Sequence, residues 1–262
     1  MTVAEALASS RIDGREARLL LAAASGFSEA SVVAFPEKPL PPDAERTFID
    51  YSERRKRGEP VAYILGHQEF YGLRLAVNPA VLIPRPETEM LVDLAVRLRF
   101  ESAVDLGTGS GAIALALKHA ARRAEVVAVE ADSAALAVAK SNAARLGLEV
   151  DFRHGRWFEP LRGERYDVIV SNPPYVANGD PHLADLAYEP KPALLAGDEG
   201  LDAIRDIARG ARVHLATRGW LLVEHGMGQD AAVRALFAQA GLEEVQTWPD
   251  LAGIPRVTGG RA

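Results

Sequence analysis

From about residue 100 onward, short runs of apolar residues alternate with longer stretches that have the composition of helices. The apolar runs predict strands at residues 103–106, 126–129, 149–152, 166–170, 220–224 and 244–248. The longer stretches predict helices at about residues 112–120, 133–146, 201–211 and 229–240. Repeated strand–helix units of this kind fold into a doubly wound, mostly parallel sheet.

Polar and glycine-rich segments follow the ends of three of these expected strands. A glycine run begins at Gly107, a carboxylate stands at Glu130, and Asn172 follows the fourth strand. Ligands of such sheets bind beyond the carboxyl ends of the strands. We therefore expect the sheet to bring these three features to one edge.

The glycine run and Glu130 together predict a cofactor that contains ribose. The run is Gly107-Thr108-Gly109-Ser110-Gly111, and it leads from a strand into a helix, so a ligand can approach its backbone closely. It lacks the lysine of a phosphate-binding P-loop. Glu130 follows about 20 residues later, at the end of the next strand, where a carboxylate can accept both ribose hydroxyls. Both NAD and S-adenosylmethionine fit this pattern.

The chain before residue 100 has a different organisation. Asp13 and Gly26 are expected to cap one helix, and a second begins near Asp43 and ends in the basic residues 54–57, which we interpret as a solvated helix end. Further strands are expected at residues 61–65 and in a hairpin over 69–77, and a helix at about 88–99. These patterns predict three parts, which are an N-terminal helical domain at 1–60, a β-hairpin linker at 61–80 and the main domain at 81–262.

Composition excludes several classes of protein. A net charge of −6 argues against broad non-specific binding of nucleic acid. The chain has no cysteine, which rules out disulfides and thiolate metal sites, and its histidines are scattered, so no metal site is expected. The first residues do not resemble a secretory signal, and no apolar run approaches the roughly 20 residues of a membrane span. These features predict a soluble, cytoplasmic protein.

The segment Asn172-Pro173-Pro174-Tyr175 suggests chemistry on a planar amino group. The side-chain carbonyl of Asn172 and the backbone carbonyl of Pro173 supply two acceptors, and Tyr175 supplies a flat ring. Together they can bind both hydrogens of an –NH2 group and cover its face. By themselves these residues are also typical of a turn after a strand. Their expected place beside Gly107 and Glu130 favours the binding role.

In this position the segment resembles the amino-methyltransferase motif of S-adenosylmethionine enzymes. With residues 105–111 and 83–89, and with shorter matches at 57–60, 70–72 and 250–257, the chain resembles the release factor glutamine methyltransferases. The resemblance covers essentially the whole chain, and the first forty residues carry least of it. It implies an α/β fold with a Rossmann-like class I methyltransferase sheet, a small N-terminal helical domain and a β-hairpin joint.

The family methylates the side-chain amide nitrogen, N5, of the glutamine in the Gly-Gly-Gln motif of class 1 peptide-chain release factors. The resemblance thus implies S-adenosyl-L-methionine as cofactor, S-adenosyl-L-homocysteine as product and release factors as partners of a monomer, with no membrane or direct nucleic-acid contact. The residues it implies as cofactor-binding are Gly107, Thr108, Gly109, Ser110, Gly111, Glu130, Trp157 and Asn172. Those implied as substrate-binding are Asn172, Pro173, Pro174, Tyr175, Arg85 and Glu87, of which Asn172, Pro173 and Tyr175 are expected to be catalytic.

Two local expectations concern the walls of the site. Relatives often carry an aspartate before Trp157, where this chain has Arg156, so Asp151 or a backbone group is expected to contact the adenine instead. Arg85 and Glu87 are bracketed by prolines and are expected to form an ion pair that shapes a pocket wall.

Other classes of function fit less well. An adenine-N6 or other nucleic-acid amino-methyltransferase faces the same geometric problem, but the acidic composition and the helical N-terminal domain favour a protein substrate. A binding module without catalysis is disfavoured by the intact glycine run and the intact segment after the fourth strand. An NAD dehydrogenase is disfavoured by Ala112, which replaces a fingerprint glycine, and by the lack of a hydride-transfer acid.

Overall fold

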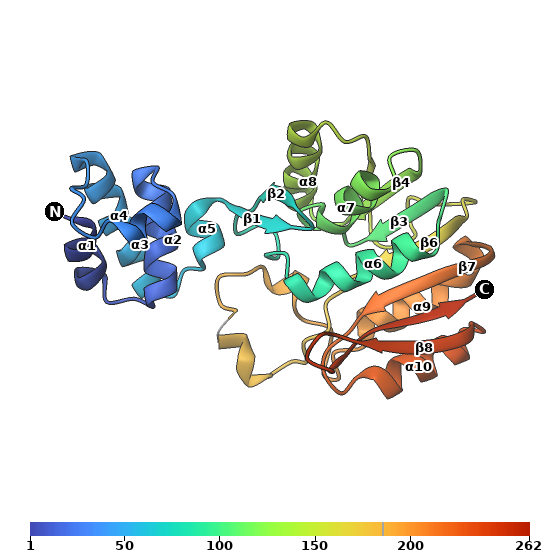
Figure 1. The fold of residues 1–262 in the computed structure, drawn as a ribbon. Helices are drawn as coiled ribbons and strands as arrows, with labels where there is room; N and C mark the ends of the chain where they lie inside the picture. The colour runs from blue at the N-terminus through green and yellow to red at the C-terminus, as the bar shows by residue number, and fades with distance from the viewer. Residues whose placement is uncertain (185) are drawn as a thin grey trace. The chain divides into compact units, whose positions relative to one another are not determined.

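The computed structural model describes residues 1–184 and 186–262 and divides into two compact units, Met1–His67 and Gln68–Ala262. Figure 1 shows the elements of both units. In the part of the chain that the structure describes, no helix combines the length and the apolar character needed to cross a membrane.

The first unit is helical. Its elements are α1 (Val3–Ser10), α2 (Gly14–Ser25), α3 (Glu29–Ala34), α4 (Pro42–Lys56) and α5 (Val61–Leu65). As predicted, Asp13 caps α2 by accepting from two backbone amides, and Gly26 ends it in the left-handed conformation. The basic end of α4 is paired with acids within the unit, since Arg54 donates to Glu59 at 2.8 Å and Arg55 to Glu16 at 2.7 Å.

The prediction of a strand at residues 61–65 is wrong, because these residues form α5. A short apolar run has no periodicity that separates a buried strand from a buried helical turn. Its flanking residues decide the outcome. Pro60 precedes the first helical residue, where a proline is tolerated, and Gly66 ends the turn with a φ of 72°. The hairpin predicted over 69–77 is present as β1 (His67–Phe70) and β2 (Leu73–Ala76).

The described residues of the second unit form a seven-stranded sheet in the order β5-β4-β3-β6-β7-β9-β8. Strands β3 to β7 are parallel, and β9 is antiparallel to both of its neighbours. The prediction of a doubly wound, mostly parallel sheet is thereby confirmed. The bounds are β3 (Ser102–Leu106), β4 (Glu125–Glu130), β5 (Asp151–His154), β6 (Tyr166–Ser171), β7 (Leu215–Glu224), β8 (Glu243–Pro249) and β9 (Pro255–Arg261).

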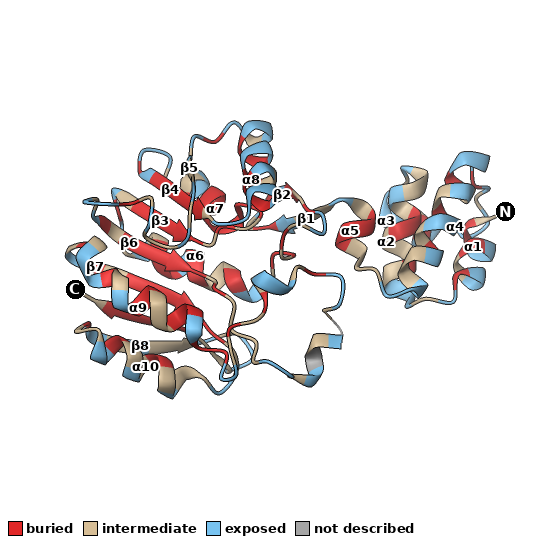
Figure 2. Ribbon diagram, turned by 180° about the vertical axis from the view of Figure 1, so that it is seen from behind, coloured by how far each residue is buried: buried red, intermediate tan, exposed pale blue. Residues whose placement is uncertain are grey.

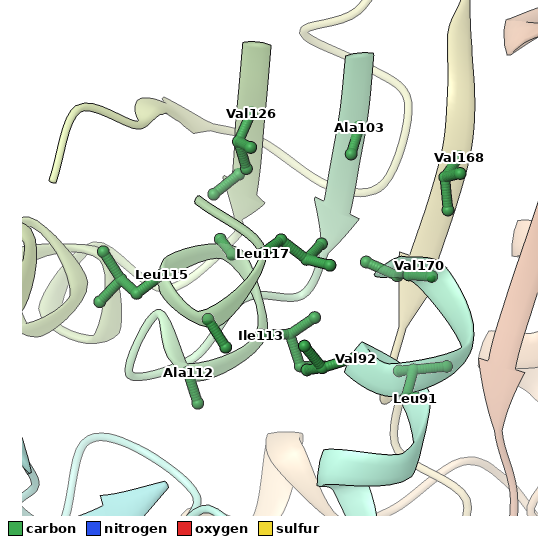
Figure 3. Close-up of a cluster of buried hydrophobic side chains, with 14 of the residues drawn as sticks. Leu91, Val92, Ala103, Ala112, Ile113, Leu115, Leu117, Val126, Val168 and Val170 are labelled. Carbon is green, nitrogen blue, oxygen red and sulfur yellow. The ribbon is translucent and has the colours of Figure 1, made fainter. Parts of the chain in front are cut away.

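Helices cover both faces of this sheet, so the central strands are largely buried, whereas the edge strands β5 and β8 are partly exposed (Figure 2). On one face, α6 and α7 pack against alternate residues of β3, β4 and β6, as the close-up in Figure 3 shows. On the other face, α9 and α10 cover the remaining alternate residues. The elements are η1 (Pro86–Thr88), α6 (Glu89–Arg97), α7 (Ala112–Ala120), α8 (Ser133–Leu146), η2 (Pro181–Ala184), η3 (Lys191–Ala193), α9 (Asp202–His214) and α10 (Asp230–Gln239).

The hairpin packs into the second unit. Phe70, Leu73 and Leu75 are buried in the core that α6 and α7 share. The side chain of Asn142, on α8, bonds both backbone groups of Ala76, accepting from its N–H at 2.7 Å and donating to its carbonyl at 3.0 Å. The hairpin is therefore an integral part of the second unit.

Strand β9 has no counterpart among the predicted strands. It contains Gly259 and Gly260, and glycine is rare in strands. The structure explains Gly259, because a Cβ there would lie 2.7 Å from Leu222 and 2.8 Å from Trp248. Close packing by side chains distant in the sequence requires a glycine at this position, and the neighbouring residues do not indicate that requirement.

Candidate active site

A cavity of about 720 Å³ opens at the carboxyl ends of β3, β4 and β6 in the second unit. As expected, the three strand ends meet there. Eight of the predicted site residues line it, namely Gly107, Thr108, Gly109, Ser110, Glu130, Trp157, Asn172 and Pro174. The lining does not include the predicted residues Gly111, Pro173, Tyr175, Arg85 and Glu87.

The first glycine of the loop lies against the ring of Trp157. Gly107 has a φ of 75°, which disfavours any other residue, and an added Cβ would lie 3.2 Å from Trp157 Cζ3. Trp157 is itself held in a left-handed backbone conformation with a φ of 49°. Its buried indole N–H has no hydrogen-bond partner among the described residues. The loop and the indole thus form one wall with an unused donor.

The last glycine of the loop serves packing. Gly111 has a φ of 85°, and a Cβ there would meet Leu115 at 3.1 Å and Ala139 at 3.2 Å. Its position allows α7 to begin close to α8. This structural role accounts for Gly111 without any contact with a ligand.

Glu130 fastens the loop while it lines the cavity. Its Oε2 accepts from the backbone N–H of Gly109 at 2.8 Å, and its Oε1 accepts from that of Asp132 at 2.9 Å. Each carboxylate oxygen can accept a second hydrogen bond. Glu130 can therefore hold the loop and still accept hydroxyl donors from a ligand.

A second carboxyl group, Asp105, lies beneath the loop and was not predicted as a site residue. It is fully buried, and its Oδ2 accepts from the Thr108 hydroxyl at 2.6 Å and from the Ala114 N–H at 3.2 Å. Its Oδ1 has no partner among the described residues. Burial raises the pKa of Asp105 to about 7, and the nearby charge of Glu130 acts in the same direction.

Asn172 presents an unpaired acceptor at the cavity. Its Nδ2 donates to Thr88 Oγ1 at 3.1 Å, whereas its buried Oδ1 has no partner among the described residues. A buried acceptor without a donor is costly unless a ligand supplies one. The site therefore offers a carbonyl oxygen to an N–H group.

Tyr175 lies behind the cavity, beside a buried glutamate. Its hydroxyl donates to Glu224 Oε1 at 3.3 Å, and burial raises the pKa of the phenol. Glu224 ends β7 and is 2% exposed, and its Oε2 lacks a partner among the described residues. Burial raises the pKa of Glu224 to about 7, while the Thr88 hydroxyl and Arg256 favour its charged form.

The expected pair of Arg85 with Glu87 is not formed. Arg85 forms an ion pair with Glu189, a residue 3% exposed at its side chain, and Glu189 also accepts from the Ile83 N–H at 3.0 Å. Proximity in the sequence suggested Glu87, but the long segment after Tyr175 returns Glu189 to this position. The pair ties that segment to residues 81–84, which contribute to the cavity lining.

Arg156, which precedes Trp157, makes contacts of its own beside the indole. Arg156 donates to Asp206 at 2.9 Å and its guanidinium lies 6.0 Å from the centre of the Trp157 ring. Asp151 bonds Arg153 at 2.8 Å and is absent from the cavity lining, so it does not take over the acidic position.

Several supporting residues were missed because the sequence gives them only weak signals. Asn142 is a lone polar residue on the buried face of α8, and its Nδ2 donates to the Ser110 carbonyl at 2.9 Å, which couples the loop to the hairpin. Glu224 stands at a strand end, so the rule that selected Glu130 and Asn172 would also have selected it. Among the described residues, no group of three or more histidine, aspartate and glutamate side chains could hold a metal ion.

The fold and the site define a class I methyltransferase. The family model for the methyltransferase small domain matches residues 86–187. A methyltransferase from Pyrococcus furiosus shares the fold with a TM-score of 0.57 and 18% identity, covering 81% of this chain and 98% of that one. The 16S rRNA N2 G1207 methyltransferase of T. thermophilus, solved with AdoMet and guanosine, has a TM-score of 0.56 and 22% identity, covering 74% and 49%.

Closer relatives narrow the class to one family. The model for the PrmC N-terminal domain matches residues 2–66. The release factor glutamine methyltransferase of Neisseria gonorrhoeae is 46% identical, covering 100% of this chain and 98% of the relative. That of Pseudomonas aeruginosa is 48% identical, covering 97% and 93%. This chain belongs to the release factor glutamine methyltransferase family.

Proposed function

We propose that this protein transfers a methyl group from S-adenosyl-L-methionine to N5 of the glutamine in the Gly-Gly-Gln motif of class 1 peptide-chain release factors, in the cytoplasm. The unpaired Oδ1 of Asn172 at the cavity carries the proposal, because it is the acceptor that a substrate amide requires. The family to which the chain belongs supports the same substrate.

The residues present fit the cofactor. A cavity of about 720 Å³ is of the size that encloses small ligands. Gly107 leaves the backbone open, Glu130 could accept the ribose hydroxyls, and the unpaired indole N–H of Trp157 could donate to a bound cofactor. When bound, the cofactor supplies an electrophilic methyl group on a sulfonium.

Asn172 and Pro173 would orient the nucleophile. An amide nitrogen is a poor nucleophile because its lone pair is delocalised into the carbonyl. If Asn172 Oδ1 and the Pro173 carbonyl accept both amide hydrogens, the lone pair that emerges as the nitrogen pyramidalises points toward the methyl group. Positioning of this kind contributes roughly 7–11 kcal/mol in well-oriented systems. Acceptors that strengthen as positive charge grows on nitrogen add electrostatic stabilisation.

The atoms balance without a general base. The nitrogen–methyl bond forms as the sulfur–methyl bond breaks, and the sulfonium becomes a neutral thioether. The methylated nitrogen then loses one hydrogen to water as a proton. Positioning and hydrogen-bond acceptance are thus the protein's contribution.

A direct assay tests the proposal. The protein is incubated with methyl-labelled S-adenosyl-L-methionine and either a class 1 release factor or the same factor with its Gly-Gly-Gln glutamine changed to alanine. Label should enter the first factor and not the second. Equal labelling of both, or labelling of added nucleic acid alone, would contradict the proposal.

A further inference from the structure

The amide of Asn172 is held by a cavity-lining residue that the sequence analysis did not predict as part of the site. Thr88, at the end of η1, is 3% exposed, and its Oγ1 accepts from Asn172 Nδ2 at 3.1 Å. The two residues are 84 positions apart in the chain. Thr88 also lines the cavity, and this contact engages the nitrogen of the amide and leaves its oxygen unpaired among the described residues.

The direction of that hydrogen bond depends on where the Thr88 hydroxyl sends its own hydrogen. A hydroxyl has one donor, and it can accept from Asn172 only if its hydrogen points elsewhere. Glu224 Oε2 is a buried acceptor that has no hydrogen-bond partner among the described residues, and the Thr88 hydroxyl acts to lower the pKa of Glu224. A charged Glu224 can only accept, so it favours a hydroxyl rotamer in which the Thr88 hydrogen points toward the carboxylate and Oγ1 is left to accept from Asn172.

We propose that Thr88 and Glu224 are positioning residues that hold the Asn172 side chain with Oδ1 directed at the substrate amide. This inference rests on the proposed methyl transfer. In the opposite orientation, Nδ2 would face the cavity and meet the N–H groups of the substrate, donor against donor. The hydrogen bond from Asn172 to Thr88, together with the influence of Glu224 on the Thr88 hydroxyl, therefore selects the productive orientation of an otherwise nearly symmetrical amide.

Substitution of Thr88 separates orientation from packing. Thr88→Val keeps the shape of the side chain and removes the acceptor, so both orientations of Asn172 become accessible. We expect kcat on the release factor to fall by about 10- to 100-fold, because one buried hydrogen bond directs the amide. The dissociation constant for S-adenosyl-L-methionine should change little, and Thr88→Ser, which restores the hydroxyl, should recover most of kcat.

Thr258→Val is the matched control. Thr258 is also a fully buried threonine, bonded to His225 at 2.9 Å and to Thr247 at 2.8 Å, and it does not line the cavity. This variant should lose stability, as Thr88→Val does, and retain the kcat of the wild type. An equal fall in kcat for both variants would show that Thr88 acts only through stability and would overturn the proposal.

The pH dependence gives a second readout. Glu224 is faced by Glu87 and Thr88 from η1, by Tyr175 after β6 and by Arg256 from β9. When Glu224 is protonated it can donate to Thr88, whose hydroxyl can then donate to Asn172 Oδ1 and hold the amide reversed. We therefore expect kcat of the wild type to rise with pH through about 7. In Glu224→Gln this rise should be absent, and kcat should stay near the low-pH value.

The outcomes distinguish this inference from the proposed function. If the wild-type protein does not label the release factor, the proposed function fails and the inference falls with it. If the wild type is active and Thr88→Val keeps full kcat, or loses cofactor binding to the same extent as kcat, only the inference is wrong. A rise with pH that persists in Glu224→Gln would likewise overturn the role of Glu224.

Discussion

At the scale of single residues, unused polar atoms mark the site. Among the described residues, five buried side-chain atoms lack a hydrogen-bond partner. Four of them belong to residues in or next to the cavity, namely Asp105, Trp157, Asn172 and Glu224. An unpaired buried polar atom costs about 1–3 kcal/mol, so such a concentration at one place is expected where a ligand completes the bonding.

Removal of the acceptor at Asn172 should stop the reaction while the cofactor remains bound. In Asn172→Ala we expect kcat to fall at least about 100-fold, since one of the two contacts that orient the amide is lost. The affinity for S-adenosyl-L-methionine, measured by calorimetry, should stay close to that of the wild type. Asn178→Ala is the control, because Asn178 is exposed and its side chain donates to Asp198 at 2.9 Å, outside the cavity lining. A parallel loss of cofactor affinity in Asn172→Ala would show that Asn172 binds mainly the cofactor.

Replacing Gly107 should reduce stability more than replacing a glycine that is needed only for its positive φ. Gly107→Ala and Gly147→Ala both place alanine at positive φ, which costs about 1–2 kcal/mol. A Cβ at Gly147 would meet nothing within 4 Å, whereas one at Gly107 would press on Trp157 at 3.2 Å. We expect Gly107→Ala to lose about 1–3 kcal/mol more free energy of unfolding and to change tryptophan fluorescence. Equal losses in denaturant titrations would contradict the contact with Trp157.

At the scale of elements, local signals predicted what local interactions determine. The expected bounds of α7 and α8 match the structure, and Asp132 and Gly147 cap α8 through their own neighbours. Local signals failed at α5, where the flanking Pro60 and Gly66 decide between strand and helix, and at β9, whose Gly259 is selected by distant side chains. Tertiary packing overrides local preference at β9, whereas at α5 the deciding residues are local and the short apolar run alone did not distinguish strand from helix.

The candidate site likewise contains residues that the sequence pattern predicts and residues that only long-range contacts place there. The residues that follow strand ends, such as Glu130 and Asn172, were predictable because the sheet edge gathers them by rule. Thr88 and Glu189 were not, because they reach the site through contacts with partners 84 and 106 residues away in the chain. Such supporting residues are visible only once the fold has been built.

The tie between Arg85 and Glu189 should be needed to hold the two segments that it joins. Arg85→Ala leaves the buried Glu189 carboxylate with the Ile83 N–H alone, so we expect a loss of about 3 kcal/mol in unfolding free energy. Glu189→Gln keeps the contact with Ile83 and leaves only the partly exposed Arg85 unpaired, so it should cost about 1 kcal/mol.

A double-mutant cycle checks this assignment. The protein with both Arg85→Ala and Glu189→Gln should be more stable than the one with Arg85→Ala alone, because no charge is then left buried. Urea titrations of the four proteins give the coupling free energy. Additive losses would mean that the two side chains do not interact.

At the scale of the whole molecule, the second unit starts earlier in the chain than the boundary predicted at residue 81. The compact second unit begins at Gln68, and the residues that line the cavity all lie between Pro79 and Ala203. The hairpin contributes Phe70, Leu73 and Leu75 to the core of this unit. A protein that begins at Val81 would lose these three side chains and the buried Val77, whereas one that begins at Gln68 keeps all four.

Truncation at Gln68 should therefore separate cofactor binding from recognition of the release factor. We expect residues 68–262 to fold and to bind S-adenosyl-L-methionine as the full chain does. If the first unit recognises the substrate, kcat/KM on the intact release factor should fall about 100-fold, equivalent to about 2.7 kcal/mol of lost binding. A short Gly-Gly-Gln peptide should be methylated equally by both proteins, because it reaches the cavity alone. Full activity of the truncated protein on the intact factor would refute a role of the first unit in recognition.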